Sequence, residues 1–173
     1  MTEEQNKHAD QQNVPPSPLV IHKQFLKDMS FENPNAPDIL RRMKEKPVRD
    51  MNIGVDVSKP DTDLDGLPDD GTYYEVYINI NASATHQGEA MFLCDVTYGA
   101  AVTIHGLDEK KAHPILFVEV PRLIYPYVRQ LIAETTGAGG YFPLMLAPVD
   151  FSSLYVKRFA KQNQEEAAAQ SEE

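Results

Sequence analysis

The sequence contains a single cysteine, Cys94, among its 173 residues. Without a second cysteine an intrachain disulfide cannot form, and nothing indicates an oxidising compartment. Long apolar runs are also missing: nowhere do about 18 apolar residues follow one another, so no transmembrane helix and no direct membrane insertion are predicted. The N-terminal residues lack the apolar core that a signal peptide needs. These absences together favour a soluble, cytoplasmic protein.

Basic residues are scarce relative to acidic ones. Lys and Arg number 16 against 26 Asp and Glu, which gives a net charge of -10 and a pI near 4.9. A surface of this sign repels phosphate backbones, so nucleic acid is not expected as the main ligand. The negative charge suits a basic protein partner, or it serves solubility alone.

The usual constellations of catalytic and metal-binding residues are absent as well. The five histidines show no HxxxH spacing and no second cysteine to pair with, so we expect no metal site. Cys94 shares the apolar face of an expected strand with Phe92 and Val96, where cysteine behaves as a small buried hydrophobe rather than a nucleophile. No Lys-Ser/Thr follows the glycines at 137–140, so a nucleotide site is unsupported. We expect no catalytic residue, no cofactor and no enzymatic activity.

A loop from Asp61 to Asp70 is rich in aspartate and resembles the opening of an EF-hand calcium loop. The twelfth position of that pattern carries Thr72 instead of the bidentate glutamate, and the flanks are strand-like instead of helical. A solvated acidic hairpin loop is therefore the favoured interpretation. The alternative is a calcium-binding or adaptor domain organised on this loop.

The chain length suits one domain with loose ends. We expect a disordered tail at residues 1–18, because it is polar and rich in proline, and an acidic mobile tail at residues 161–173. Between them, alternation of apolar and polar residues predicts strands at 19–26, 51–57, 74–82, 90–98 and 101–105, with Gly99 separating the last two. Their short links favour antiparallel pairing.

Helical spacing appears in three places. A short helix is expected at 38–46, and a longer one runs from Pro121 to the glycines at 137–140, with Leu123–Ala133 at its centre. Pro126 lies far inside it, so we expect an irregular turn or kink there. Asp150 is placed to cap a last helix with an apolar stripe that includes Phe151. Residues 115–120 are strand-like in isolation.

Three separated blocks carry a resemblance to a known family. DMSFENPNAP, MFLCDVTYGAAVTIHGL and PRLIYPYVRQLIAETTGAGGYFPLMLAPVDF resemble, in the same order, the SecB family of protein-export chaperones. The likeness extends over about Leu19–Phe159. It implies an α+β subunit of residues 19–160, with a four-stranded antiparallel sheet, a long helix packed on one face and a C-terminal helix. It also implies a homotetramer arranged as a dimer of dimers, and makes residues 115–120 the lead-in to the long helix.

The resemblance further implies an ATP-independent holdase that keeps precursor proteins unfolded and delivers them to the translocation ATPase SecA. Apolar and aromatic residues are expected to line a groove for unfolded clients, although about half of them are expected to touch client and the rest to be core. The groove residues are Met51, Ile53, Val55, Leu123, Tyr125, Tyr127, Leu131, Tyr141, Phe142, Leu144, Leu146 and Phe151.

Two further sets follow from the resemblance, residue by residue. The SecA-binding surface falls on Asp28, Glu32, Leu93 and Asp95. The positions used for oligomer assembly fall on Cys94, Val96 and Tyr98. Because successive strand residues point to opposite faces, the first set and the second are expected on opposite faces of the sheet.

Overall fold

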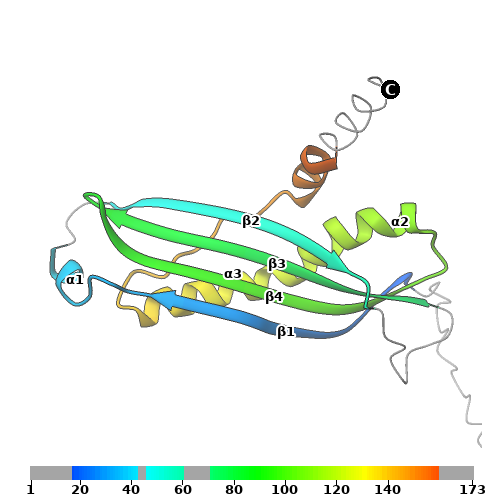
Figure 1. Cartoon of the computed structure of the whole chain (residues 1–173), viewed down its shortest axis with the longest axis horizontal. Coiled ribbons are helices and arrows are strands. Elements are labelled where there is room, and N and C mark those ends of the chain that lie inside the picture. The colour runs from blue at the N-terminus through cyan, green and yellow to red at the C-terminus, as the bar shows by residue number, and fades with distance from the viewer. Residues whose placement is uncertain (1–16, 43–45, 61–70, 160–173) are drawn as a thin grey trace, which may run out of the picture.

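The fold is described from a computed structural model that covers residues 17–42, 46–60 and 71–159. Four antiparallel strands form one sheet in the order β1-β4-β3-β2, as the resemblance implied, and a long helix lies along one of its faces (Figure 1). The strands are β1 (Leu19–Glu32), β2 (Val48–Ser58), β3 (Gly71–His86) and β4 (Glu89–His105). The helical elements are α1 (Asp38–Arg42), α2 (Glu109–Pro114), the π-helical η1 (Ile115–Glu119) and α3 (Val120–Ala138), and residues 151–159 are also helical.

The alternation in the strands sorts apolar residues to the face that α3 covers. On β3, Val76, Ile78 and Ile80 are fully buried, and their partners on β4 include Val96 opposite Ile80. Ile124 and Val128 of α3 are also fully buried and belong to the same core. Two apolar surfaces packed in this way remove each other from water, which stabilises each buried aliphatic side chain by about 1.5–3 kcal/mol.

Gly99 does not separate two strands, contrary to the expectation from the sequence. β4 continues through it, and Gly99 is paired with Phe25 on one side and Tyr77 on the other. A Cβ atom built on Gly99 would lie 2.8 Å from each of these two rings. The glycine is therefore explained by the close approach of two aromatic side chains, and the separately predicted strands 90–98 and 101–105 are one strand.

The helix under the sheet begins earlier than the sequence suggested. Helical backbone runs from Glu109 through η1 into α3, so residues 115–120 are helical and form the lead-in that the resemblance implied. Asp108 caps the start by accepting a hydrogen bond from the Lys111 N–H. The helix is continuous across Pro126, and the irregularity lies instead in the wider turn of η1. The expected irregular turn at Pro126 is therefore wrong, and Pro121 lies inside a longer helical run.

After α3 the chain reverses at Gly140, which has a φ of 89°, a value that glycine adopts readily. Residues 141–150 then run back along α3 without regular structure and lead to the helical residues 151–159 (Figure 1). Asp150 caps that helix as predicted, because its carboxylate accepts a hydrogen bond from the Ser153 N–H at 3.1 Å. A hydrogen bond of 2.7 Å from the Ser153 hydroxyl, together with that from the Ser153 N–H, holds the pKa of Asp150 below its ordinary value.

Several sequence expectations fall outside the described residues. They are the aspartate-rich stretch 61–70, the end of the short helix at 43–45 and nearly all of both predicted tails. Of the N-terminal tail, Ser17 and Pro18 are described, and the Pro18 carbonyl accepts a hydrogen bond from the His105 N–H. Among the described helices, none is long and apolar enough to cross a membrane.

Candidate functional site

The predicted groove residues divide into a buried half and a more exposed half. Six have at most 7% of their surface exposed: Val55, Tyr125, Tyr141, Leu144, Leu146 and Phe151. Ile53 and Leu131 are partly buried, whereas Met51, Leu123, Tyr127 and Phe142 are exposed. The six buried side chains support the surface from inside the core. Only the other six side chains offer apolar area to a ligand without rearrangement.

The segment 141–150 is fixed to the body of the protein by hydrogen bonds at three points. The Tyr141 hydroxyl bonds to the Met91 carbonyl and the Asn33 side chain, at 2.8 and 2.7 Å. Farther along, the N–H of Leu144 donates to Thr136 Oγ1, and the Tyr125 hydroxyl donates to the Ala147 carbonyl.

This anchoring decides which side chains of the segment face outwards. With Tyr141, Leu144 and Leu146 buried, Phe142 is 90% exposed and Met145 is 61% exposed. The segment thus presents two large apolar side chains to solvent on a fixed backbone. The sequence interpretation included Phe142 but missed Met145, although its place between two inward-facing leucines was a usable signal.

On α3, the apolar side chains that face away from the core form a stripe along one side. Leu123 and Tyr127 are four residues apart, which places them on one face of the helix, and each is about half exposed. The Tyr127 ring is stacked on Tyr98 of β4 with 6.4 Å between ring centroids and 5° between ring planes. Leu26 on the edge strand β1 is paired with Tyr98 and is also exposed.

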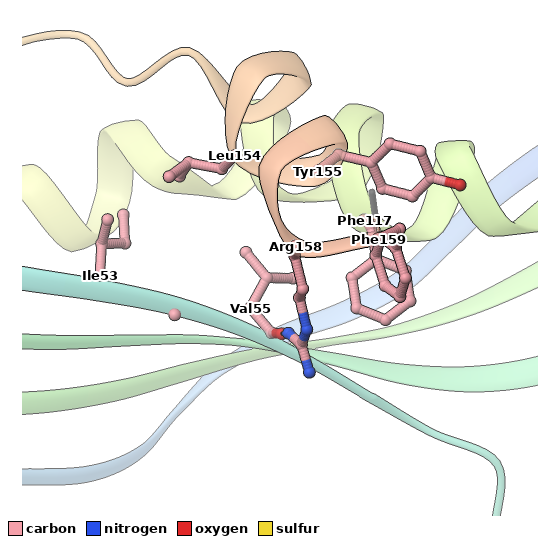
Figure 2. Close-up of a pocket in the computed structure, with 8 residues that line it drawn as sticks. Ile53, Val55, Phe117, Leu154, Tyr155, Arg158 and Phe159 are labelled. Carbon is pink, nitrogen blue, oxygen red and sulfur yellow. The ribbon is translucent and has the colours of Figure 1, made fainter. Parts of the chain in front are cut away.

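A second apolar surface lies between β2, η1 and the C-terminal helix. It surrounds a pocket of about 180 Å³ (Figure 2). Its walls are Ile53, Gly54 and Val55 of β2, Phe117 of η1, and Leu154, Tyr155, Arg158 and Phe159 of the C-terminal helix. The sequence identified the apolar stripe of the last helix but gave a role only to Phe151 in it. It missed Phe117, which lies in the stretch that looks strand-like.

Arg158 connects the C-terminal helix to the edge strand of the sheet. Figure 2 shows its side chain pointing from the helix towards Val55, whose carbonyl accepts a hydrogen bond from it. The guanidinium also lies 3.7 Å from the Asp56 carboxylate and faces the Phe117 ring at 5.4 Å. Arg158 therefore has its hydrogen-bonding and charge partners within the subunit.

His113 lies in an aromatic cluster that holds the same helix. Its Nδ1 is 2.8 Å from the Tyr155 hydroxyl, and its ring is 4.6 Å from the rings of both Phe117 and Phe159. Burial lowers the pKa of His113 below its ordinary value. Glu109 opposes that shift, while Arg158 adds to it. The surroundings of His113 thus favour the neutral imidazole over the charged one.

The opposite face of the sheet gathers the four residues predicted to bind SecA. The strand register places Glu32 opposite Leu93 and Ser30 opposite Asp95, with Asp28 paired two residues farther along, at Thr97. Leu93 is 41% exposed. No basic side chain of the described residues forms an ion pair with these three acids. Asn81 of β3 donates a hydrogen bond of 2.7 Å to Asp95, which orients that carboxylate.

The three positions predicted for oligomer assembly lie on the face that α3 covers. Cys94 and Val96 are 0% and 3% exposed, inside the core of the single chain. Burial raises the pKa of the Cys94 thiol, which disfavours the reactive thiolate. Tyr98 is partly exposed. Of the three, only Tyr98 could contact another subunit directly, and the other two could act on assembly only by shaping the surface beneath it.

A metal centre has no support from the residues that the structure describes. Within 17–42, 46–60 and 71–159, no three His, Cys, Asp or Glu side chains come together as metal ligands. The calcium alternative depends on residues 61–70, which lie outside those ranges.

Comparison with known sequences shows similarity over almost the whole chain. Residues 10–162 match the family described as preprotein translocase subunit SecB. The chain is 36% identical over 170 residues to protein-export protein SecB 1 of Gluconobacter oxydans, covering 94% of each chain. It is 38% identical over 141 residues to protein-export protein SecB of Caulobacter vibrioides, covering 82% of this chain and 81% of that one.

Comparison with solved structures gives the same fold at lower identity. A SecB-like chaperone of Mycobacterium tuberculosis, solved in complex with a peptide from an antitoxin, superimposes with a TM-score of 0.59. The two chains are 19% identical, and the match covers 76% of this chain and 90% of the other. At that identity the likeness supports the four-stranded sheet and long helix described above.

Proposed function

This chain belongs to the SecB family of preprotein translocase subunits, and we propose that it is an ATP-independent cytoplasmic holdase for unfolded precursor proteins. The observation that carries the proposal is the set of exposed apolar side chains on fixed backbone beside α3, above all Phe142 and Met145. Exposed apolar area of this kind costs solubility, so its presence on well-anchored elements indicates a binding surface. An unfolded polypeptide is the ligand class with matching exposed apolar groups.

The surface suits loose recognition of sequence. Burial of an apolar side chain is favourable in any orientation, because the hydrophobic effect is non-directional. Each fully buried side chain contributes about 1.5–3 kcal/mol, so firm holding requires several contacts at once. Folded proteins have already buried the groups that would make those contacts. Selection of unfolded chains then follows from the chemistry without nucleotide hydrolysis.

We further propose that four copies assemble as a dimer of dimers. β1 is an edge strand of 14 residues with one side unpaired in the single chain, and such edges readily pair with another strand. The exposed stripe of Leu123 and Tyr127 on α3, together with Leu26, supplies a second apolar surface for association. A tetramer would multiply the number of apolar sites for one client and so raise its overall affinity.

Delivery to SecA is assigned to the opposite face of the sheet. Asp28, Glu32 and Asp95 offer three carboxylates that form no ion pair within the described residues, around the exposed side chain of Leu93. An acidic surface with an apolar centre suits a basic partner, and charge complementarity speeds the encounter. Because this surface faces away from α3, client and SecA could bind at the same time.

Solution mass measured with and without an unfolded client tests assembly and holding together. Light scattering is expected to give a tetramer of the 19.4 kDa chain that binds a reduced, unfolded precursor and ignores the same precursor once folded. A monomer mass would contradict the assembly. A tetramer that binds neither form, or binds both equally, would contradict the holdase function.

A further inference from the structure

A second pocket lies at the start of the C-terminal helix, beside Phe151. It has a volume of about 240 Å³ and lies between α3 and the end of the segment 141–150. Its walls are Arg122, Tyr125, Pro126, Arg129, Pro148, Val149 and Phe151. Sites for whole small molecules usually measure about 300–1,000 Å³, so this volume suits one or two side chains of a longer ligand.

The two arginines of this pocket differ in their partners. Arg122 is neutralised within the chain: its Nη1 lies 3.0 and 3.1 Å from the two carboxylate oxygens of Glu119, and its Nη2 contacts Ser152 at 3.3 Å. Arg129 forms no ion pair with any described residue. Its Nε atom is buried without a hydrogen-bond partner. The pocket therefore holds one satisfied guanidinium and one without a counter-ion.

A buried arginine nitrogen without a hydrogen-bond partner among the described residues is unexpected in this protein. Acidic residues exceed basic ones by ten, and Arg158, the third arginine near the C-terminal helix, is paired with Asp56. Leaving a buried donor without a partner costs about 1–3 kcal/mol, and native proteins keep few such groups. Arg129 as a whole is only partly buried, and it lines the pocket. A carboxylate is the ligand group that complements a guanidinium best.

We propose that this pocket, here called the Arg129 pocket, binds a carboxylate side chain of a client segment whose neighbouring apolar side chain packs on Pro126 and Val149. The proposal rests on the holdase function above and adds a rule of client recognition to it. A surface with a net charge of -10 repels acidic segments of a client. Arg129 offsets that repulsion at one point of the groove, so that an isolated glutamate or aspartate does not interrupt binding.

The test compares two extended apolar peptides that differ only by Glu or Gln at one central position. Binding to the full-length protein is measured by fluorescence anisotropy at low salt, for the wild type and for Arg129→Gln. The substitution is expected to weaken binding of the Glu peptide about 3- to 10-fold and binding of the Gln peptide less than about twofold. These values are those of a partly exposed charged hydrogen bond. The excess loss for the Glu peptide is expected to shrink at high salt.

Arg122→Gln serves as the matched control, because it removes the same charge from the same pocket at a position that Glu119 already neutralises. It is expected to change the ratio of the two affinities by less than about twofold. If Arg129→Gln weakens both peptides equally, or neither, the inference is overturned while the holdase function stands. If neither peptide binds the wild type, the proposed function itself fails.

A measurement on the wild type alone protects the test against a variant that does not fold. The pKa of the peptide glutamate, labelled with ¹³C at the carboxylate, is followed by NMR in the free and bound states. Proximity to Arg129 is expected to lower this pKa on binding, since a nearby positive charge favours the ionised form. A raised or unchanged pKa in the bound peptide would overturn the inference.

Discussion

One face of the sheet is covered by α3 and the segment 141–150, whereas the other has no helix of the described residues over it. The covered face is apolar, and its exposed margin carries Phe142, Met145 and Tyr127. The uncovered face carries Asp28, Glu32 and Asp95, and its side chains are linked by polar contacts such as that from Asn81 to Asp95. Because successive residues of a strand point to opposite faces, a single sheet carries an apolar surface on one side and a charged surface on the other.

The two surfaces also differ in how the protein holds them in place. On the covered side, burial fixes Tyr141, Leu144 and Phe151, and their neighbours in sequence are thereby presented to solvent. On the uncovered side, aromatic rings form a local support: Phe25 meets Tyr77 edge to face, and Lys27 lies 4.0 Å above the Tyr77 ring. The first surface depends on the core of the subunit, and the second depends mainly on strand register.

The largest effect is predicted for a substitution that removes a buried side chain beneath the covered face. Phe151→Ala removes a ring that is 1% exposed and lies 5.7 Å from the ring of Tyr125. Loss of a buried phenylalanine costs about 3–5 kcal/mol of the free energy of unfolding. Chemical denaturation measures this, with all variants at one protein concentration because assembly contributes to stability.

Phe142→Ala is the matched control in the same segment, since this ring is 90% exposed. We expect a change within about 0.5 kcal/mol in stability, together with weaker binding of unfolded client. Equal losses of stability for the two variants would show that the division into buried and presented residues is wrong.

The next effect concerns the support of the uncovered side. Gly99→Ala would place a Cβ atom 2.8 Å from the rings of Phe25 and Tyr77, so one of them must move. Overpacking of this kind costs about 1–3 kcal/mol of stability. Gly54→Ala on the edge strand β2 is the control, because nothing lies within 4 Å of its new Cβ atom. Thermal unfolding that shows no difference between the two would contradict the role assigned to Gly99.

A double substitution separates the two faces by function. Asp28→Ala with Asp95→Ala is expected to weaken SecA binding about tenfold, or about 1.4 kcal/mol, through lost charge complementarity. Client binding is expected to stay within twofold of the wild type. Calorimetry measures both, and Asp38→Ala, which removes an exposed acid of α1, controls for net charge. Loss of both activities together would reject the division of surfaces.

The smallest effect is a pH dependence of the C-terminal helix. The pKa of His113 is lowered in the folded protein, mainly by burial, so the detached state takes up a proton first. The packing of the C-terminal helix on His113 is therefore fully stable above the ordinary histidine pKa of 6.5. This packing weakens as the pH falls from 6.5 towards the lowered pKa of the folded protein. Amide exchange of residues 151–159, corrected for its intrinsic pH dependence, is expected to quicken as the pH falls over this range.

His113→Phe keeps an aromatic ring in the cluster and removes the titrating group. In this variant the amide exchange of residues 151–159, corrected for its intrinsic pH dependence, is expected to be independent of pH over the same range. A variant that keeps the wild-type dependence would assign the effect to another group.

Local patterns in the sequence were enough to predict much of the fold. Alternation of apolar and polar residues predicted the strands, and Asp150 caps the last helix as the sequence predicted. Gly99 was misread as a break because its reason lies in two rings from other strands, Phe25 and Tyr77, which no local pattern reveals. Residues 115–120 looked like a strand because a helix buried on several sides loses its amphipathic period.

The candidate site was harder to predict than the fold. Sequence identified twelve apolar groove residues but could not separate Phe142 from Phe151, because exposure depends on the path of the chain after Gly140. Phe117 and Arg129 were missed, because their roles depend on residues far along the chain. Phe117 lines a pocket with the C-terminal helix, and Arg129 forms no ion pair within the described residues.

The most direct test of the account is the refolding rate of a precursor protein in the presence of the wild type and of the Asp28→Ala, Asp95→Ala variant. Both are expected to slow refolding to the same extent without nucleotide or calcium, because the apolar surface that holds the client lies on the other side of the sheet. Refolding at its normal rate at every excess of wild-type protein would contradict the holdase function. Slowing by the wild type alone would contradict the separation of the two faces.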